Sequence, residues 1–266
     1  MNSRMTPFDN AIIQPLSTSV KRIIIFDTET SGMNGFGKNS MPPSRCDHAL
    51  QVSWLVYDAQ TREIIRTFNS YVKVAETVEI TEFISNLNHC TREKCDKGML
   101  MIDILQEFCK EYERCDVIVA HNLSFDSKVM RTEIVRNLGE IRKSYPNVMS
   151  LFDPEYVKSV NKSLFCTMKY TIPLCKLPYP KKPGQIERSG PDNRSDMDKY
   201  KYPKLDELHQ HLFPQDVPPE GLHDAMVDVM TTLRCMMSVL YNVTLPMVHE
   251  LMDYVPSIEE NIENTV

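Results

Sequence analysis

The sequence predicts an α/β fold, in which one β-sheet is flanked by helices. Two short hydrophobic runs, residues 23–26 and 117–120, have the length and composition of buried central strands. Apolar residues spaced three or four apart elsewhere in the chain have the periodicity of amphipathic helices. Buried strands combined with such helices are typical of a sheet that helices cover on its faces.

The first strand, expected near residues 22–28, ends in two acidic residues. Asp27 and Glu29 are two positions apart, so their side chains point to the same side of a strand. Two like charges about 4 Å apart repel by roughly 4 kcal/mol at an effective dielectric near 20. A fold tolerates this repulsion when a cation lies between the carboxylates. This stretch alone leaves a second interpretation open, in which the strand frays into a polar turn at residues 30–32.

Two further strands follow the first one. A loop over residues 31–48, rich in Gly, Asn, Pro and Ser, leads to a strand at residues 49–57. A turn at residues 58–61 separates it from a third strand at residues 64–74. The short links predict that these three strands form an antiparallel meander.

Helical periodicity begins after the third strand. One apolar stripe, typical of an amphipathic helix, consists of Met99, Ile102, Leu105, Phe108 and Tyr112. Residues 116–120 form the fourth strand and lead into the run His121–Asp126. There Ser124 is the expected N-cap of a helix that reaches about Leu138 and carries Asp126 in its first turn.

The middle of the chain ends in a segment of unusual composition. Pro154 is expected to begin a short helix, and residues 164–166 to form a short fifth strand. Residues 176–203 hold five prolines and almost no apolar core residues, which predicts a long loop. Eight basic and four acidic side chains lie between Lys176 and Lys204. This basic loop is a candidate phosphate contact; a solvated insertion without a binding role is an equally good interpretation.

Three helices are expected in the C-terminal part of the chain, over residues 205–212, 221–241 and 246–254. The long middle helix follows two prolines and Gly221. His223 lies in the turn just before this helix, and Asp228 lies about one turn inside it. A histidine at this place is either a helix cap or, together with Asp228, part of a reactive site.

The overall composition is that of an ordinary globular protein, with 42% hydrophobic and 25% charged residues. The net charge of −6 excludes a polycation that coats nucleic acid, so any nucleic-acid site must be local or made of metal ions. The polar first twenty residues contain Pro7 and Pro15 and do not resemble a signal peptide. No run approaches the ~20 apolar residues that a transmembrane helix needs.

The eight cysteines are scattered along the chain and include no Cys-x-x-Cys pair. We interpret them as reduced thiols of an intracellular protein, cytoplasmic or nuclear and not secreted. Cys90 and Cys95 lie close to His89, but the usual spacing of zinc ligands is missing and no second pair follows. A zinc site there is therefore disfavoured.

Four acidic residues and one histidine are expected to meet beyond the strand ends. Asp27 and Glu29 end the first strand, Asp126 follows the next buried strand, and His223 and Asp228 flank the start of the long helix. Reactive groups of open sheets gather at such ends. The set matches a two-metal site, and its hard oxygen ligands favour Mg²⁺ or Mn²⁺ over Zn²⁺. Two such ions about 3.5–4 Å apart can activate water and stabilise the leaving oxygen in phosphodiester cleavage.

Three motifs carry a resemblance to a known family. They are Phe26–Thr30 (FDTET), His121–Asp126 (HNLSFD) and His223–Asp228 (HDAMVD). Over about residues 22–242 the sequence resembles the DEDDh, or DnaQ-like, branch of the DEDD 3′–5′ exonuclease superfamily. The His-x4-Asp spacing separates this branch from its sister branch with Tyr-x3-Asp, since Asp224 stands where that tyrosine would be. Gln51, the pair Cys166–Thr167 and the run Lys204–Leu208 also fit the resemblance.

The resemblance implies a ribonuclease H-like fold with a mixed five-stranded sheet and helices on both sides. It also implies two divalent cations, Mg²⁺ or Mn²⁺, held by Asp27, Glu29, Asp126 and Asp228. In that assignment Asp27 would bridge both ions, Glu29 and Asp228 would hold the inner ion, and Asp126 would hold the outer one, partly through water.

His223 would be the general base that takes a proton from the attacking water, a role that suits an imidazole near neutral pH. His121 and Phe125 would pack and position groups at the strand–helix junction. Many relatives carry a His-Gly-Ile-Thr run that touches the terminal nucleotide, whereas this chain has Leu87–Thr91 there. Six residues are expected as substrate contacts: Thr28, Thr30, Asn88, His89, Lys181 and Lys182.

The sequence therefore predicts a 3′–5′ exonuclease that releases nucleoside 5′-monophosphates from the 3′ ends of nucleic acids. DNA is favoured over RNA, because no RNA-binding domain or basic tail is recognisable. Single strands are favoured because the scissile strand must enter a narrow metal site. Two alternatives stay open: an exoribonuclease that trims RNA 3′ ends, and a nucleic-acid-binding or polymerase-accessory module whose nuclease activity is secondary.

The expected organisation is a lead-in over residues 1–20, one exonuclease domain over 21–255 and a polar tail over 256–266. The loops at 31–48 and 176–203 are insertions that flank the predicted site. The expected partners are nucleic-acid 3′ ends and a polymerase or repair complex, with no membrane, and the chain is expected to be a monomer or a homodimer.

Overall fold

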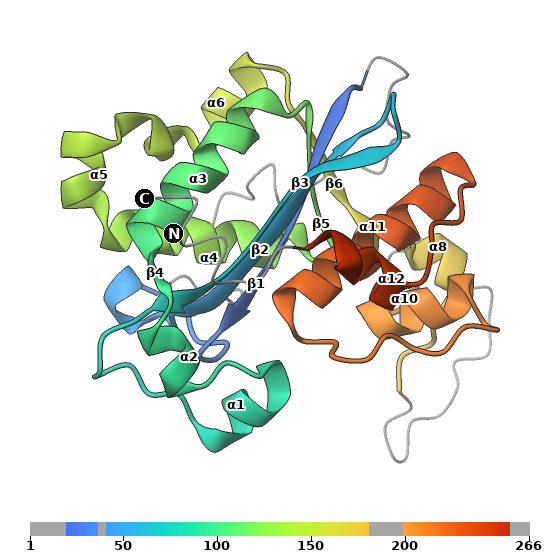
Figure 1. Ribbon diagram of the computed structural model, residues 1–266, viewed down its shortest axis with the longest axis horizontal. Coiled ribbons are helices and arrows are strands. Elements are labelled where there is room, and N and C mark those ends of the chain that lie inside the picture. The colour runs from blue at the N-terminus through green and yellow to red at the C-terminus, as the bar shows by residue number, and fades with distance from the viewer. Residues whose placement is uncertain (1–19, 37–40, 181–198, 256–266) are drawn as a thin grey trace.

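The structure is a computed structural model that describes residues 20–36, 41–180 and 199–255 (Figure 1). A mixed six-stranded sheet runs through the middle of it, in the order β4-β3-β2-β1-β5-β6. The strands are β1 (Arg22–Thr30), β2 (Ala49–Asp58), β3 (Glu63–Lys73), β4 (Met99–Leu100), β5 (Val117–Ala120) and β6 (Ser163–Cys166). β1, β2 and β3 form the predicted antiparallel meander, and β5 and β6 add to it in parallel.

The helices connect and cover these strands. Those before β6 are α1 (Glu82–Asn88), α2 (Arg92–Asp96), α3 (Met101–Arg114), α4 (Leu123–Arg136), α5 (Leu138–Ser144) and α6 (Pro154–Ser159). Those after it are α7 (Thr167–Tyr170), α8 (Ile172–Cys175), α10 (Leu205–Leu212), α11 (Ala225–Tyr241) and α12 (Val248–Leu251). Three short 3₁₀ helices lie at Pro43–Arg45, Pro146–Ser150 and Met252–Tyr254.

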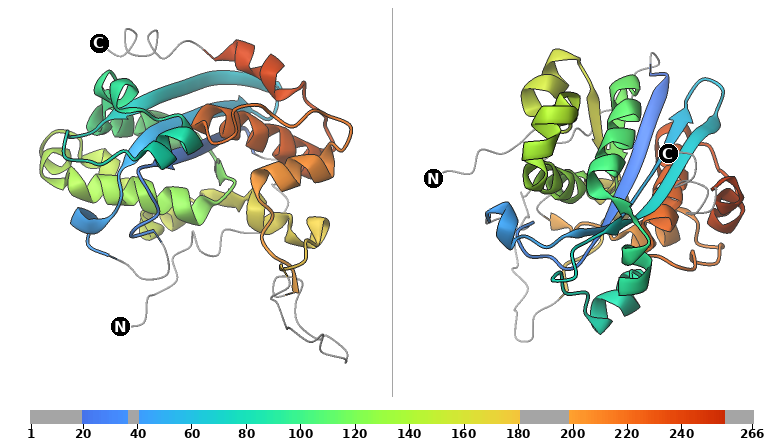
Figure 2. Two further views of the ribbon diagram at one scale, coloured as in Figure 1. Left: turned by 90° about the horizontal axis from the view of Figure 1, so that it is seen from below. Right: turned by 60° about the vertical axis from the view of Figure 1, so that its left-hand side comes forward.

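The two faces of the sheet are covered by different helices, as Figures 1 and 2 show. Alternate residues of β1 point to opposite faces: Ile24 and Phe26 pack against α3 and α4, whereas Ile23 and Ile25 pack against α11. The α3 side is rich in aromatic residues, and Phe108 lies in edge contact with both Phe26 and Trp54. β1 is therefore covered on both faces, as the buried strands β2 and β5 are, and this packing fixes its position.

The strand count differs from the five that we predicted. The sixth strand, β4, consists of Met99 and Leu100 and pairs in parallel with Val72 and Lys73 of β3. The sequence placed Met99 in the helical stripe that comes next. Its side chain is buried in the same core as that stripe, so the apolar pattern is correct, although the backbone is extended there and the helix begins at Met101.

The prediction that Ser124 is the N-cap of this helix is wrong. The helix α4 begins at Leu123, and Asn122 is its N-cap. The carbonyl oxygen of Asn122 already accepts hydrogen bonds from the backbone N–H groups of Phe125 and Asp126. Ser124 is therefore a residue of the first turn, while Asp126 lies in that turn as expected. The chain is helical to Arg136 and again from Leu138, which matches the predicted end near Leu138.

The remaining predicted elements are present with small shifts. The strand β1 continues to Thr30, and the long helix begins at Ala225 rather than in the turn before it. The last predicted helix is split into α12 and a 3₁₀ turn. Within the loop predicted over 176–203, Pro178 and Tyr200 form an isolated bridge. Residues 181–198, the lead-in over 1–19 and the tail over 256–266 lie outside the described residues.

Candidate active site

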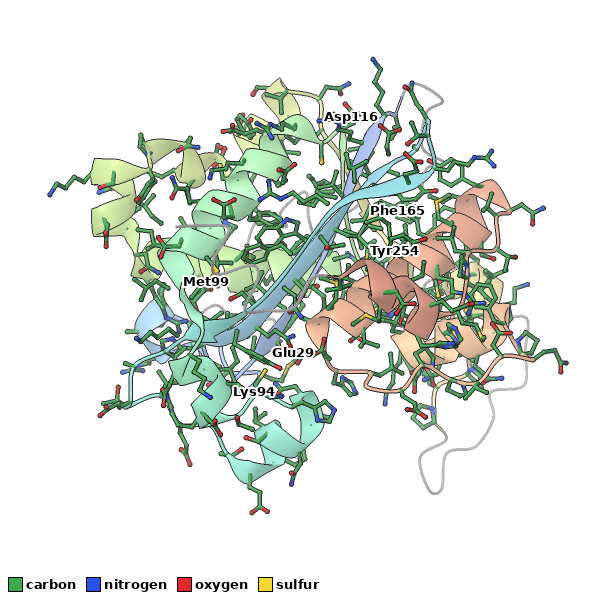
Figure 3. The ribbon with its side chains drawn as sticks, in the orientation of Figure 1. Glu29, Lys94, Met99, Asp116, Phe165 and Tyr254 are labelled. Carbon is green, nitrogen blue, oxygen red and sulfur yellow. The ribbon has the colours of Figure 1, made fainter. Side chains whose placement is uncertain are left out.

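The end of β1 extends past its parallel neighbour. β5 pairs with Ile23–Ile25 and ends at Ala120. The last residues of β1 therefore pair with a strand, β2, along one edge only. Asp27 and Glu29 lie on this extension and point to the α11 face of the sheet, as their spacing predicted. Figure 3 shows Glu29 at one end of the sheet, opposite Asp116, where α2 and the layer containing α11 approach each other.

A cavity of about 600 Å³ opens at this end of the sheet. Its size lies within the range of roughly 300–1,000 Å³ that is usual for sites that bind small molecules. All five residues predicted as catalytic line it: Asp27, Glu29, Asp126, His223 and Asp228. The structure thus brings together residues that are up to about two hundred positions apart in the chain.

Asp126 reaches the cavity from the opposite side of the sheet. It lies in the first turn of α4, on the face that Thr28 shares. One oxygen of its carboxylate accepts hydrogen bonds from the backbone N–H of Thr28 at 3.1 Å and from the Thr28 hydroxyl at 2.8 Å. The site therefore extends over both faces of the sheet at the end of β1. Asp27 and Glu29 come from the strand itself, and each face adds one acid from a helix, Asp126 from α4 and Asp228 from α11.

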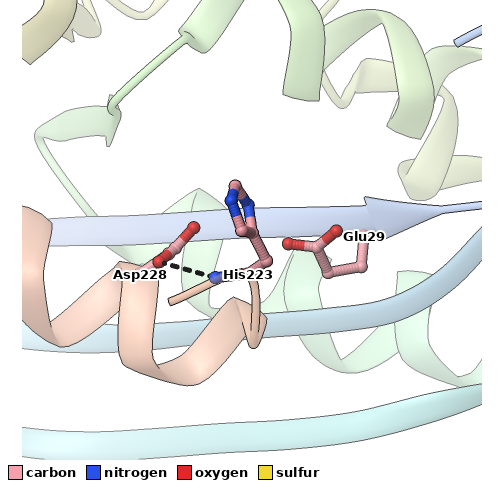
Figure 4. A group of neighbouring side chains, drawn as sticks. All are labelled: Glu29, His223 and Asp228. Atoms are coloured by element: carbon pink, nitrogen blue, oxygen red, sulfur yellow. Dashed lines mark hydrogen bonds between the residues drawn. The ribbon is translucent and has the colours of Figure 1, made fainter. Parts of the chain in front are cut away.

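His223 and Asp228 enter from the start of α11. The Asp224 carboxylate caps this helix by accepting hydrogen bonds from the N–H groups of Met226 and Val227. The backbone N–H of His223 donates to Oδ1 of Asp228 at 3.3 Å. The imidazole lies between the carboxyl groups of Asp228 and Glu29 (Figure 4), and one polar atom from each of these three side chains lies within 4.8 Å of the others.

Burial and mutual repulsion disturb the ionisation of the four acids. Burial, followed by the charges of Asp126 and Asp228, raises the pKa of Asp27 well above its usual range. Burial raises the pKa of Glu29 to about 9, with Asp228 as the second cause. Burial also raises the pKa of Asp126 and of Asp228 to about 7 each. Such shifts mark a group of carboxyls that needs protons or cations to balance its charge.

The donor set fits divalent cations. It consists of four carboxylates and one imidazole around one cavity, and thiols do not contribute. Hard oxygen ligands of this kind bind Mg²⁺ and Mn²⁺. Among the residues that the structure describes, the only group of three or more potential ligands with closely spaced donor atoms is Glu29, His223 and Asp228. At the disfavoured zinc site, Cys90 and Cys95 are buried in a small apolar cluster with Leu50, and His89 is exposed.

The predicted substrate contacts separate into three groups. Thr28 and Thr30 line the cavity, but their hydroxyl groups donate to Asp126 and to the carbonyl of Gly32. Asn88 also lines it, and its amide donates to the carbonyl of Thr30 at 3.2 Å. His89 does not line the cavity; it ends α1 in a left-handed conformation. Lys181 and Lys182 lie outside the described residues.

His121 and Phe125 both line the cavity and have partners in the protein. The His121 ring lies 3.0 Å from the Thr167 hydroxyl and 3.1 Å from the carbonyl of Pro203, and burial lowers its pKa to about 4. The Phe125 ring meets Phe36 edge to face at 5.4 Å. These contacts join the second motif to Phe36, Thr167 and Pro203, and the positioning roles of His121 and Phe125 stay predictions.

Sequence analysis did not single out the rim of the cavity. One side is formed by Met33, Phe83 and Leu87, whose side chains remain 70%, 72% and 40% exposed. The other side includes Tyr202, which is 48% exposed, and Lys204. Phe83 and Leu87 are four residues apart on α1, and this apolar spacing in a short capped helix was the signal that could have found them.

Comparison with known proteins gives a family. The model of a family described as exonuclease matches residues 24–236, which is more than half of the chain. The chain belongs to this exonuclease family. Its three motifs place it in the DEDDh branch, as the sequence predicted. No curated protein sequence gives a significant match to this exonuclease-family chain.

Solved structures of exonucleases share the fold. E. coli Exonuclease I in complex with a dT13 oligonucleotide is 17% identical, with a TM-score of 0.54 over 88% of this chain and 43% of that one. The same enzyme in complex with a 5cy-dA13 oligonucleotide is 17% identical, with a TM-score of 0.53 over 92% of this chain and 45% of that one. The match thus covers less than half the length of Exonuclease I. At this identity the likeness shows the ribonuclease H-like fold.

The structure also bears on the remaining sequence-based expectations. All eight cysteines are free and buried. No helix in the described part of the chain combines the length and apolar character that a membrane span requires.

Proposed function

We propose that this member of the exonuclease family removes nucleotides one at a time from the 3′ ends of nucleic acids and releases nucleoside 5′-monophosphates. The observation that carries the proposal is the single cavity into which four carboxylates and one imidazole from the three motifs converge. The raised carboxyl pKa values support it, because a fold accepts such repulsion where cations complete the site.

Two divalent cations, Mg²⁺ or Mn²⁺, would be held by Asp27, Glu29, Asp126 and Asp228. When bound, they supply positive charge that activates water and stabilises the leaving oxygen. The charges of Asp126 and Asp228, which come from helices on opposite faces of the sheet, both raise the pKa of Asp27, so this residue could be a ligand shared by both ions. The hydrogen bonds from Thr28 fix one oxygen of Asp126, whose residue lines the cavity.

His223 would act as the general base. Its ring is exposed and lies between Glu29 and Asp228, so it can accept the proton of a water molecule that attacks the terminal phosphodiester. In this step a bond forms between the water oxygen and phosphorus, and the bond from phosphorus to the 3′ oxygen breaks. The shortened strand keeps a 3′ hydroxyl, whose proton comes from solvent, and the phosphate leaves with the terminal nucleoside.

The rim of the cavity supports an unpaired substrate. Met33, Phe83 and Leu87 on one side and Tyr202 on the other expose apolar and aromatic surface at the entrance. Bases of single strands stack on such side chains, each stack contributing about 1–3 kcal/mol. Bases inside a duplex have no free faces to offer, so a paired end would first have to fray.

We infer DNA as the favoured substrate. The support is the fold shared with E. coli Exonuclease I, which is described in complex with dT13 and 5cy-dA13 oligonucleotides.

One basic side chain is placed to contact the substrate backbone. Lys204 lies exposed on the rim and is the only lysine or arginine among the described residues that line the cavity, which makes it the candidate contact for a backbone phosphate.

The deciding experiment compares matched 5′-labelled single strands of DNA and RNA, incubated with Mg²⁺ or with EDTA, beside the variant Asp228→Ala. A Mg²⁺-dependent ladder that shortens DNA from the 3′ end, absent in the variant, is the expected result. A ladder on RNA alone would keep the chemistry and replace DNA with RNA. Binding without any ladder would contradict the proposal and favour a nucleic-acid-binding module.

A further inference from the structure

The turn that carries His223 has an unfavourable backbone. His223 has a φ of 71° and Gly221 a φ of 77°, and the N–H of Asp224 closes the turn on the carbonyl of Gly221 at 2.9 Å. Glycine adopts such a φ readily, whereas a residue with a Cβ atom does so only at a steric cost. Contacts outside the turn must therefore hold His223 in this conformation.

Gln51 supplies these contacts from the sheet. It is fully buried on β2, directly opposite Glu29 in the β1–β2 register. Its Nε2 donates to Oδ2 of Asp224 at 3.0 Å, and its Oε1 accepts from the backbone N–H of Ala225 at 3.2 Å. The Gln51 amide thus holds the side chain of Asp224 and the backbone of Ala225, the two residues that follow His223.

The other side of Gln51 is anchored as well. Its Nε2 also donates to Oδ1 of Asn69 at 3.0 Å, and the Ser53 hydroxyl donates to the same oxygen at 2.8 Å. Both N–H bonds of the Gln51 amide are therefore used, and the amide cannot turn over without losing them. Because the carboxylate of Asp224 at the same time caps α11, a continuous set of hydrogen bonds runs from the sheet into the turn.

From this arrangement, and on the basis of the proposed function, we infer that Gln51 and Asp224 are positioning residues for catalysis: their hydrogen bond holds His223 against Asp228 and Glu29. Neither side chain needs to touch the substrate for this role. Without Gln51, the N–H of Ala225 loses its buried acceptor and Asp224 loses a donor, so the turn can relax from its left-handed conformation. The imidazole would then leave its place between the two carboxyl groups.

The first test is a double-mutant cycle with Gln51→Met and His223→Ala. Gln51→Met keeps the length of the side chain but removes its hydrogen bonds, and it should lower kcat by about 10–100-fold, as is usual for residues that orient catalytic groups. In the His223→Ala background the same change should cost less than about 3-fold, because the group that Gln51 positions is already gone. Equal losses in both backgrounds would overturn the inference.

A charge exchange provides a second, independent test. Gln51→Glu alone sets a carboxylate against Asp224, and Asp224→Asn alone sets an amide against the amide of Gln51, so each single change should lower kcat. The double change Gln51→Glu with Asp224→Asn restores a donor facing an acceptor at this pair, while the hydrogen bond to Asn69 stays lost. Its kcat should therefore rise above that of Gln51→Glu without reaching the wild-type value. A double variant as slow as the slower single one would contradict a direct interaction.

A matched control and a structural readout separate this inference from the proposed function. Ser70→Ala removes a side-chain hydrogen bond from the neighbouring strand β3, donated by the buried Ser70 hydroxyl to the carbonyl of Tyr71 at 2.9 Å, and it should leave kcat unchanged because this bond is outside the set that reaches the turn. The imidazole resonance of His223, identified as the NMR signal that His223→Ala removes, should shift or broaden in Gln51→Met and stay in place in Ser70→Ala. An unmoved resonance in Gln51→Met would overturn the inference even if the chain degraded nucleic acid as proposed.

Discussion

The two halves of the cavity are built in different ways. The acids at the end of β1 are fixed by strand register and by burial between two helical layers, and Thr28 holds Asp126 directly. The turn before α11 instead presents an exposed imidazole on a left-handed backbone and depends on Gln51 and Asp224. The enclosed half is suited to bind cations, and the exposed half is suited to meet water and the substrate. Substitutions in each half can therefore test this division.

The variant Asp27→Ala should be the least active. Asp27 lies in the enclosed half, and its loss should lower activity by more than about 10³-fold. Removal of a single hydrogen-bond donor that stabilises a transition state usually costs roughly 10²–10³-fold, and loss of a ligand for the cations should cost more. Single-turnover assays with Mg²⁺ and Mn²⁺ measure this effect. Asp116→Ala, at the opposite end of the sheet (Figure 3), is the matched control on activity. Comparable rates for Asp27→Ala and wild type would contradict a catalytic role for Asp27.

His223→Ala should lower kcat by roughly 10²–10⁴-fold, the usual contribution of a general base. Since we assign His223 to the exposed half, the variant should bind Mn²⁺ nearly as tightly as wild type, which calorimetry can measure. A large loss of Mn²⁺ affinity would instead make His223 a cation ligand, as its distance of less than 4.8 Å from the donor atoms of Glu29 and Asp228 allows.

The rim should matter for binding more than for chemistry. Phe83→Ala removes the most exposed aromatic side chain of the rim and should raise KM for single-stranded DNA by about 5-fold or more, since one base stack contributes about 1–3 kcal/mol. The kcat should change little. Tyr254→Ala, an exposed aromatic residue that does not line the cavity, is the control. An effect on kcat without an effect on KM would contradict this role for the rim.

The acid cluster should make stability depend on pH when cations are removed. Its pKa values are raised to about 7 for Asp126 and Asp228 and to about 9 for Glu29, against about 4 in an unfolded chain. The native state therefore binds protons more tightly, and the stability this confers is complete below about pH 4 and is lost as pH rises to about 9. In EDTA, the Tm of wild type should fall relative to that of Asp228→Asn between pH 5 and 9.

Added Mg²⁺ should reverse this trend, because cations then replace the protons. The Tm gained with Mg²⁺ should be larger at pH 8 than at pH 5 for wild type, and small at both values for Asp228→Asn. A gain in Tm of wild type that is the same at both pH values would contradict the interpretation that Mg²⁺ replaces protons bound by the four acids.

The weakest effect is expected at Lys204. If Lys204 contacts one backbone phosphate, Lys204→Ala should weaken binding of all sequences alike and reduce the slope of log affinity against log salt by about 0.7, the value for one phosphate of a single strand. Lys143→Ala, at the exposed end of α5 and away from the cavity, is the control. An unchanged salt dependence would leave the phosphate contact to other residues.

Local periodicity and the three motifs were enough to predict that Asp27, Glu29, Asp126, His223 and Asp228 meet at one site. The two-residue spacing placed Asp27 and Glu29 on one side of β1, because side chains alternate along any strand. Helical spacing gave α10 its bounds and placed Asp126 and Asp228 in first turns. The motifs then predicted the family and the ribonuclease H-like fold. Where local patterns were ambiguous, the predictions failed: Met99 fits a helical stripe and a buried strand equally well, and Ser124 and Asn122 are both good caps.

The way in which these parts are held together became visible only in the folded chain. Thr28 bonds to Asp126 across 98 positions of the chain, and Gln51 bonds to Asp224 across 173 positions. No local pattern encodes such pairs, because a hydrogen bond between distant residues depends on how the sheet and the helices pack. The same holds for the rim, where α1 and the segment before α10 meet at one cavity only after folding. The sequence thus specified which residues meet at the cavity, and the packing specified how they are held there.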